Sequence, residues 1–269
     1  MTIDSSMVAD VRPVEAPERR AAARRTHPAV WCFRALIAFP FVVMTPEIVA
    51  AAQGRAGAAG NISTSVADVL GNAAFILFIL MLAVTPVQTI TGWKWHVVLR
   101  RDLGMGMFAV AAFDLVLAAL FTGDTFHGGF FDRIGGHTFL AAGTLAVLLL
   151  VPLALTSTQR AKRWLGRNWK WLHRLTYVVW AIILFHLALL FSLTSFFLDA
   201  VLVSVPLFVL RLPPVARWWS SSRRTGRHKV LRGVLTVALV VVFVVGFVPF
   251  VHQFVTVSKG AISNHPVDD

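Results

Sequence analysis

Long apolar segments alternate with short polar segments over most of the chain. A helix that crosses a bilayer needs about 20 mostly apolar residues, and backbone polar groups in lipid must be hydrogen-bonded within a helix or a closed barrel. Segments as uniformly apolar as these are typical of helices. The pattern therefore predicts an all-α, polytopic membrane helix bundle with about seven transmembrane helices, at residues 29–52, 67–90, 103–122, 137–156, 171–193, 196–211 and 231–251.

The amino-acid composition also indicates a protein of the lipid bilayer. The chain has 269 residues, of which 57% are hydrophobic and 14% are charged, whereas about 25% of residues are charged in a typical soluble domain. We expect a disordered cytoplasmic tail at residues 1–28 and the main transmembrane domain at 29–218. Residues 219–269 should hold a basic cytoplasmic loop, an extra transmembrane helix and an outer tail. Arginine pairs in the first region would also suit a twin-arginine export signal, but the apolar segment that follows is long enough to remain as an anchor.

The net charge of +12 is distributed unevenly between the two sides of the predicted bundle. If every segment spans, 21 of the 25 Lys and Arg residues fall on one side and 3 on the other, and Arg34 lies inside the first helix. Basic loops remain in the cytoplasm, so we expect the inner (cytoplasmic) membrane, with the N-terminus inside and the C-terminus outside. Anionic lipid headgroups account for these charges, and no nucleic-acid partner is needed.

Two histidines stand near the ends of the segment LHRLTYVVWAIILFH, residues 172–186. His173 should lie near the cytoplasmic surface and His186 about 20 Å deeper. An ionisable residue inside a span suggests a function, and a neutral imidazole is a good iron ligand; His173 could equally be an interfacial residue. On a straight helix the two side chains would point about 140° apart. We therefore expect a distorted helix or different neighbours for each.

Other redox and nucleotide motifs are missing from the chain. Cys32 is the single cysteine, which excludes an intramolecular disulfide and a CxxC motif. No phosphate-cradling glycine loop or HExxH motif occurs. If the protein moves electrons, the soluble donor domain must be on another chain.

Several motifs together resemble the ferric-reductase-like transmembrane family. They lie in AVTPVQTITGWKWHVVLRRDLGM, residues 83–105, and in PLALTSTQRAKRWLGRNWKWLHRLTYVVWAIILFH, residues 152–186. The most specific is Leu-His-Arg-Leu-x-Tyr with a second histidine thirteen residues after the first. The resemblance covers roughly residues 30–218, so the last predicted helix lies outside it.

The resemblance implies a b-type cytochrome that acts as an electron-transfer subunit rather than as a self-sufficient enzyme. Electrons would pass from a cytoplasmic flavin reductase or membrane quinol to a periplasmic redox partner subunit. The implied cofactors are one or two haem b groups, with FMN or a quinone as further possibilities. His173 and His186 fall on haem-ligand positions of the family. The family's histidine in the third helix is replaced by Asp114.

This replacement leaves the second haem ligand open. His137, at the start of the fourth predicted helix, should lie at about the depth of His186 and is the first candidate; His127 and His252 are weaker ones. His96 is expected at the headgroup boundary or near a flavin or quinone ring. The alternative function is a haem-free or quinone-binding membrane scaffold that has lost the third-helix ligand.

Asp114 itself admits two interpretations. A charged aspartate at the centre of a span costs about 2.5–3.5 kcal/mol, so it should be protonated, paired with a cation such as Arg34, or exposed to a water-filled cavity. It could serve as a proton-relay group or be the remnant of a lost haem site.

Overall fold

Helices make up the regular structure of the part of the chain that the computed structural model describes, which is residues 29–53, 69–92, 99–121, 134–191, 194–226 and 228–263. Two histidines considered from the sequence, His96 and His127, lie outside these ranges, as do His27 and His265. The helices are α2 (Ala29–Ala52), α4 (Gly71–Thr91), α5 (Leu99–Phe121), α7 (Thr138–Leu155), α8 (Gln159–Leu165), α9 (Arg167–Leu172), α10 (Leu175–Phe191), α11 (Ser195–Val209), α12 (Pro213–Thr225) and α13 (Lys229–Ser263).

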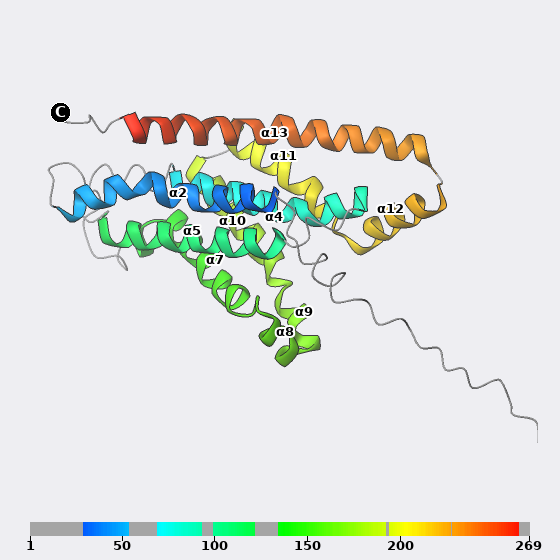
Figure 1. The fold of residues 1–269 in the computed structure, drawn as a ribbon, viewed down its shortest axis with the longest axis horizontal. Coiled ribbons are helices and arrows are strands. Elements are labelled where there is room, and N and C mark those ends of the chain that lie inside the picture. The colour runs from blue at the N-terminus through cyan, green and yellow to red at the C-terminus, as the bar shows by residue number, and fades with distance from the viewer. Residues whose placement is uncertain are drawn as a thin grey trace, which may run out of the picture.

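The prediction of an all-α polytopic membrane bundle is confirmed. Six spans in the described ranges are long and apolar enough to cross a membrane, and a seventh is added if α11 and α12 form one bent span. The bundle packs around α4, which contacts α5, α11, α12 and α13 and carries a nearly continuous run of buried apolar side chains. Figure 1 shows α13 lying along α11 on one side of the bundle, with α7 to α9 on the opposite side.

Helix α11 is shorter than the bilayer is thick, because a proline pair follows it. Its 15 residues span about 22 Å, against a hydrocarbon core of about 30 Å. Pro213 and Pro214 start α12, and the residue before a proline is kept out of the helical region. The two helices meet at 66°. Residues 213–225, which we expected in connecting segments, are thus helical.

The segment that carries His173 and His186 is broken rather than straight. Helix α9 ends at Leu172, and α10 begins at Leu175. His173 forms the C-cap of α9, and its backbone N–H donates to the carbonyl of Trp169. The expected helix distortion is therefore present, and it lies at the first of the two histidines.

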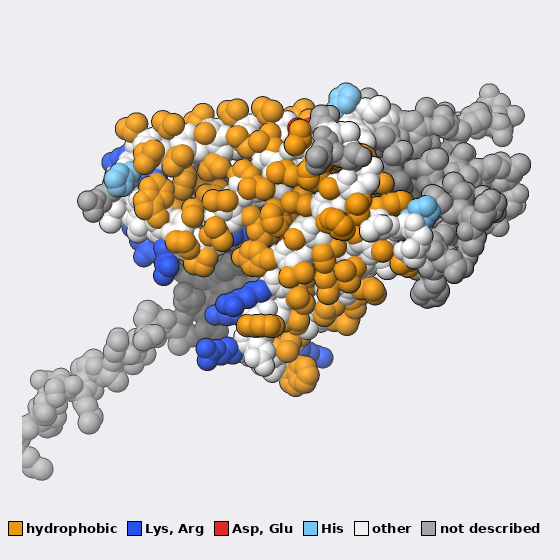
Figure 2. Space-filling view, turned by 180° about the vertical axis from the view of Figure 1, so that it is seen from behind, with side chains coloured by type: hydrophobic (Ala, Val, Ile, Leu, Met, Phe, Trp, Pro, Cys, Tyr) orange, Lys and Arg blue, Asp and Glu red, His pale blue; other side chains and the backbone are white. Residues whose placement is uncertain are grey.

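The surface matches a membrane environment. Large apolar side chains of α13, including Val234, Val241 and Val248, are more than half exposed. Figure 2 shows hydrophobic side chains over most of one face, with Lys and Arg gathered towards one end and around α8 and α9. The described basic residues thus follow the uneven distribution seen in the sequence.

Arg211 ties the α11–α12 bend to the middle of α4. Pro86 has no backbone N–H, so the carbonyl of Leu82, four residues earlier, loses its helical partner. The Arg211 guanidinium donates to that carbonyl through Nε at 3.2 Å and Nη2 at 3.0 Å, and to the carbonyl of Met81 at 3.1 Å. A cation from one helix junction therefore satisfies the backbone at the proline of another.

Candidate functional site

Two cavities lie within the bundle and share a wall. The larger has a volume of about 450 Å³ and is lined by His186; the smaller has a volume of about 280 Å³ and is lined by His173. Phe78, Met107 and Leu150 line both. We call them the His186 cavity and the His173 cavity. The two predicted histidines thus serve different neighbours, as one of our two expectations required.

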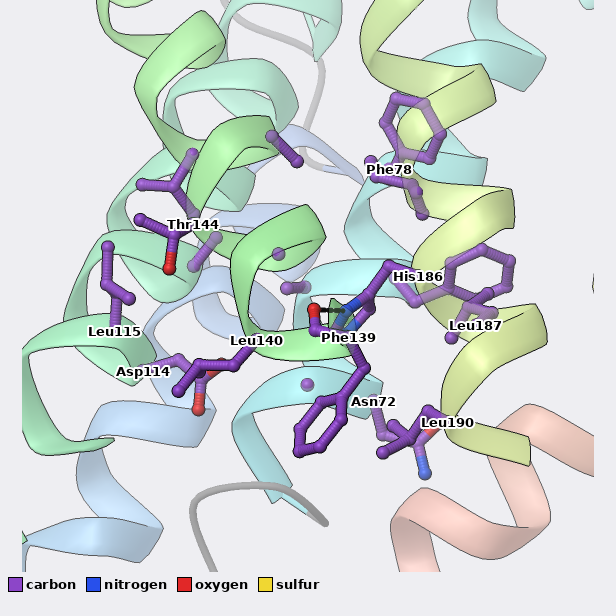
Figure 3. Close-up of a pocket in the computed structure, with 18 of the residues that line it drawn as sticks. Asn72, Phe78, Asp114, Leu115, Phe139, Leu140, Thr144, His186, Leu187 and Leu190 are labelled. Atoms are coloured by element: carbon purple, nitrogen blue, oxygen red, sulfur yellow. Dashed lines mark hydrogen bonds between the residues drawn. The ribbon is translucent and has the colours of Figure 1, made fainter. Parts of the chain in front are cut away.

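The His186 ring is held in one orientation by α7. Its Nδ1 lies 2.7 Å from the carbonyl oxygen of Phe139, and because a carbonyl can only accept, Nδ1 carries the proton and donates. The lone pair is then on Nε2. A histidine that ligates a metal commonly donates its other ring N–H in this way, which fixes the tautomer and the ring orientation. Figure 3 shows this bond and His186 between α7 and α10.

Gly143 makes room for this ring. A Cβ atom added at Gly143 would lie 3.1 Å from Cε1 and 3.2 Å from Nδ1 of His186, which is closer than ordinary van der Waals contact. The histidine ring therefore lies against the backbone of α7, and a larger residue at this position would have to displace it slightly.

The two other predicted site residues of this region line the same cavity. Asp114 comes from α5, and His137 is the N-cap residue of α7. The ring of Phe139 lies between the two histidines, with its centroid 5.7 Å from that of His137 and 6.4 Å from that of His186. The structure therefore brings His137, Asp114 and His186 to one cavity.

The His186 cavity also contains buried polar atoms without partners. Oδ1 of Asn72, Oδ1 of Asp114 and Oγ1 of Thr144 are buried and make no hydrogen bond within the described part of the chain. All three residues line the cavity, and Figure 3 shows them around it. The rest of the lining is mainly aliphatic and aromatic, so these atoms are the natural attachment points for a polar guest.

The His173 cavity has a different character, since it is lined by the cations Arg100, Arg101 and Lys162. Nε2 of His173 lies 3.4 Å from Oγ1 of Thr156. The ring also packs on Trp169, with centroids 4.2 Å apart.

Trp169 is held in turn by its neighbours. Its Nε1 donates to the carbonyl of Thr156 at 3.0 Å, and Nζ of Lys162 lies 5.1 Å from the ring centroid. This cavity could take an anionic group at its basic rim.

Some sequence expectations are corrected. Arg34 does not pair with Asp114: its Nε and Nη2 both lie 3.0 Å from Oδ2 of Asp102, one turn into α5. His252 is exposed on α13, and it is not among the residues that line either cavity. Asp114 lines the His186 cavity, which agrees with one of the alternatives considered for it, exposure to a cavity.

Sequence reasoning missed Asn72, Gly143 and Thr144. Each is a small or polar residue within a predicted span, which is a weak signal, because such residues are common at helix crossings in membranes. Among the described residues no group of three His, Cys, Asp or Glu side chains could hold a metal ion by itself. A metal ion in this region would therefore have to be part of a cofactor that supplies further ligands.

Comparison with known proteins points to one family. The profile of the family described as "Ferric reductase like transmembrane component" matches residues 70–185, a range that includes His173 and ends one residue before His186. A curated relative, the "Protein-methionine-sulfoxide reductase heme-binding subunit MsrQ" of Ralstonia nicotianae (strain ATCC BAA-1114 / GMI1000), is 33% identical over 159 residues, which cover 59% of this chain and 70% of the relative. No solved structure matches.

Proposed function

Because this chain belongs to the ferric-reductase-like transmembrane family and is similar to MsrQ, we propose that it is a haem-binding subunit that transfers electrons across the membrane. The bound haem b would supply one-electron redox chemistry. The protein would hold the cofactor, exclude water and set its surroundings. The chain is a multi-pass membrane protein, as this role requires.

The observation that most directly supports the proposal is the tautomer of His186. With Nδ1 donating to Phe139, Nε2 offers a lone pair at the wall of a cavity of about 450 Å³. Haem brings four nitrogen ligands of its own, so it needs only one or two axial ligands from the protein. We assign His186 as an axial ligand and His137, on the same cavity, as the second one.

The His173 cavity is proposed as a second cofactor site. His173 would be the ligand of a second haem, with the carboxylates of that haem near Arg100 and Arg101. The same basic rim would suit the phosphate of FMN or the headgroup of a quinol, which are the two classes of donor that we consider.

The direction of transfer follows from the proposed orientation. We place the His173 cavity on the cytoplasmic side of the inner membrane and the His186 cavity towards the periplasm, because the basic residues cluster beside His173. A cytoplasmic flavin reductase or membrane quinol would donate electrons. By analogy with the name of the relative, the acceptor would be a periplasmic methionine-sulfoxide reductase partner.

An absorption spectrum tests the cofactor. Protein expressed with ample haem supply and purified in detergent should show a Soret shift and an α-band upon reduction with dithionite. Absence of both would favour the alternative, a haem-free or quinone-binding scaffold, for which Asp114 in the third-helix position is the supporting feature.

Reporter fusions test the orientation. Fusions after residues 60, 130, 222 and 265 should report outside, outside, inside and outside. A cytoplasmic signal after residue 265 would contradict a spanning α13 and an outer C-terminus.

A further inference from the structure

The unpartnered polar atoms of the His186 cavity form a set with a common chemistry. Asn72 is on α4, Asp114 on α5 and Thr144 on α7, so three helices each present one such oxygen to the same cavity. Asn72 is only 6% exposed. A buried acceptor left without a donor costs about 1–3 kcal/mol, and convergence of three on one cavity indicates a guest that satisfies them together.

The cofactor of the proposed function does not satisfy these oxygens. The edge of a haem presents C–H groups and two carboxylates, which are acceptors when ionised. The side-chain oxygen of Asn72 can only accept, and a carboxylate on Asp114 can only accept. The guest must therefore bring hydrogen-bond donors, and water is a small molecule that does so. A buried water typically makes about three hydrogen bonds to polar groups, which is the number of oxygens available.

We propose that Asn72, Asp114 and Thr144 form a hydrated proton-binding site, in which Asp114 takes up a proton when an electron enters the His186 cavity. The electron part of this inference rests on the proposed function; the hydrated carboxyl does not. Water held by Asn72 and Thr144 would deliver the proton to Asp114.

The step balances in charge and atoms. One electron from the flavin or quinol donor reduces the bound redox group, and one proton from bulk water converts the Asp114 carboxylate into a carboxylic acid. Uptake of the proton cancels the negative charge that the electron adds inside the low-dielectric bundle, where an uncompensated charge is costly. When the electron leaves for the acceptor, Asp114 releases the proton.

Few other charged groups face Asp114. The other titratable residues that line the cavity are His137 from the start of α7 and His186 from α10, and α4 contributes none there. On α2, which packs against α5, Arg34 is paired with Asp102, and the side chain of Glu47 is outside the described set. The two histidines are assigned to the iron, so Asp114 is the group expected to exchange protons.

Redox titration at a series of pH values tests the coupling. In the wild-type protein the midpoint potential of the haem in the His186 cavity should fall as the pH rises. Asp114→Asn should remove most of this pH dependence at unchanged haem content, and Asp114→Glu should restore it. Thr144→Val and Asn72→Leu should weaken it, since each removes one contact to the water. Asp199→Asn is the matched control on α11, away from the cavity, and it should keep the wild-type slope.

Infrared spectroscopy separates failure of this inference from failure of the proposed function. A pH-induced infrared difference spectrum needs no haem, and it should contain a carboxylic-acid band that shifts in D₂O and disappears in Asp114→Asn. Equal potential slopes in wild type and Asp114→Asn, with haem present in both, would overturn the inference. If haem is absent but the infrared band is present, only the electron-transfer function is overturned. Absence of the band would overturn the hydrated carboxyl itself.

Discussion

The two cavities are both lined by α4, α5, α7 and α10, yet they differ in chemistry. In the His186 cavity the histidine donates to a backbone carbonyl at 2.7 Å, the lining is mostly apolar, and the polar atoms among it include a carboxyl. In the His173 cavity the histidine lies 3.4 Å from a hydroxyl oxygen and is packed on an indole, and the rim is cationic.

Under the proposed function, this difference would separate two roles within one electron path. The apolar cavity would shield a redox group from bulk water, and one carboxyl would balance its charge. The basic cavity would attract an anionic or phosphate-bearing molecule at the surface. Phe78, Met107 and Leu150 contact both cavities, so groups bound in the two would be separated only by one layer of side chains.

The largest expected effect is that of removing the His186 imidazole. His186→Ala should abolish the haem signal of the His186 cavity, because it removes the ligand whose ring is held in place by the Phe139 carbonyl, and His137 alone should not retain the cofactor. The haem-to-protein ratio and the reduced-minus-oxidised spectrum measure this loss. His252→Ala, which alters an exposed histidine on α13, is the control. Unchanged haem content in His186→Ala would mean that both predicted histidines are structural.

A smaller effect is expected at the proposed second ligand. His137→Ala should keep the haem but shift it from low spin to high spin, since one axial ligand is lost. Asp114→His should instead give a low-spin, six-coordinate spectrum, because it returns the histidine that the family pattern has in the third helix. Electron paramagnetic resonance of the oxidised protein distinguishes the spin states. A low-spin signal that survives in His137→Ala would exclude His137 as the ligand.

Crowding the His186 ring should have a partial effect. Gly143→Ala places a Cβ 3.1 Å from the ring, so the ring must move while its ligand atom is retained. We expect a roughly 10-fold loss of haem affinity, as is common when the support of a metal ligand is disturbed. Haem titration of apoprotein measures it. Gly233→Ala on α13, where an added Cβ meets no atom within 4 Å, should bind haem like the wild type.

The smallest effect on the cavities is expected from the clamp at Arg211. Arg211→Met leaves the Leu82 carbonyl without its donors, which should lower the free energy of unfolding by about 1–3 kcal/mol. Denaturation of the detergent-solubilised protein, followed by helical circular dichroism, measures the change. Arg217→Met, which removes only an exposed bond to the Pro213 carbonyl, should change stability much less. A normal spectrum of the bound haem in both variants would show that the clamp is structural.

Comparison of the predicted and observed helices shows which boundaries the local sequence pattern is sufficient to predict. The first predicted span, residues 29–52, has the bounds of α2, and most other boundaries were close, because a lipid-exposed helix must be apolar along its whole length. The predicted end of the last span at residue 251 was wrong, since α13 continues to Ser263. The bend at Pro213 and the helical state of the basic segment after it were missed, since α12 carries its apolar residues only on one face and buries Trp219 against the bundle.

The features of the candidate site can likewise be divided into those that the sequence predicted and those that only the structure revealed. The residue types and spacing of the sequence alone determined a polytopic helix bundle, an uneven charge distribution and two exceptional histidines, because each of these depends on what a single helix can tolerate in lipid. Only the tertiary structure decided that Asp114, His137 and His186 share a cavity, that Arg34 pairs with Asp102, and that Asn72 and Thr144 join Asp114. Those facts depend on the rotation and crossing of helices that are far apart in the chain, and packing between side chains sets them rather than any local pattern.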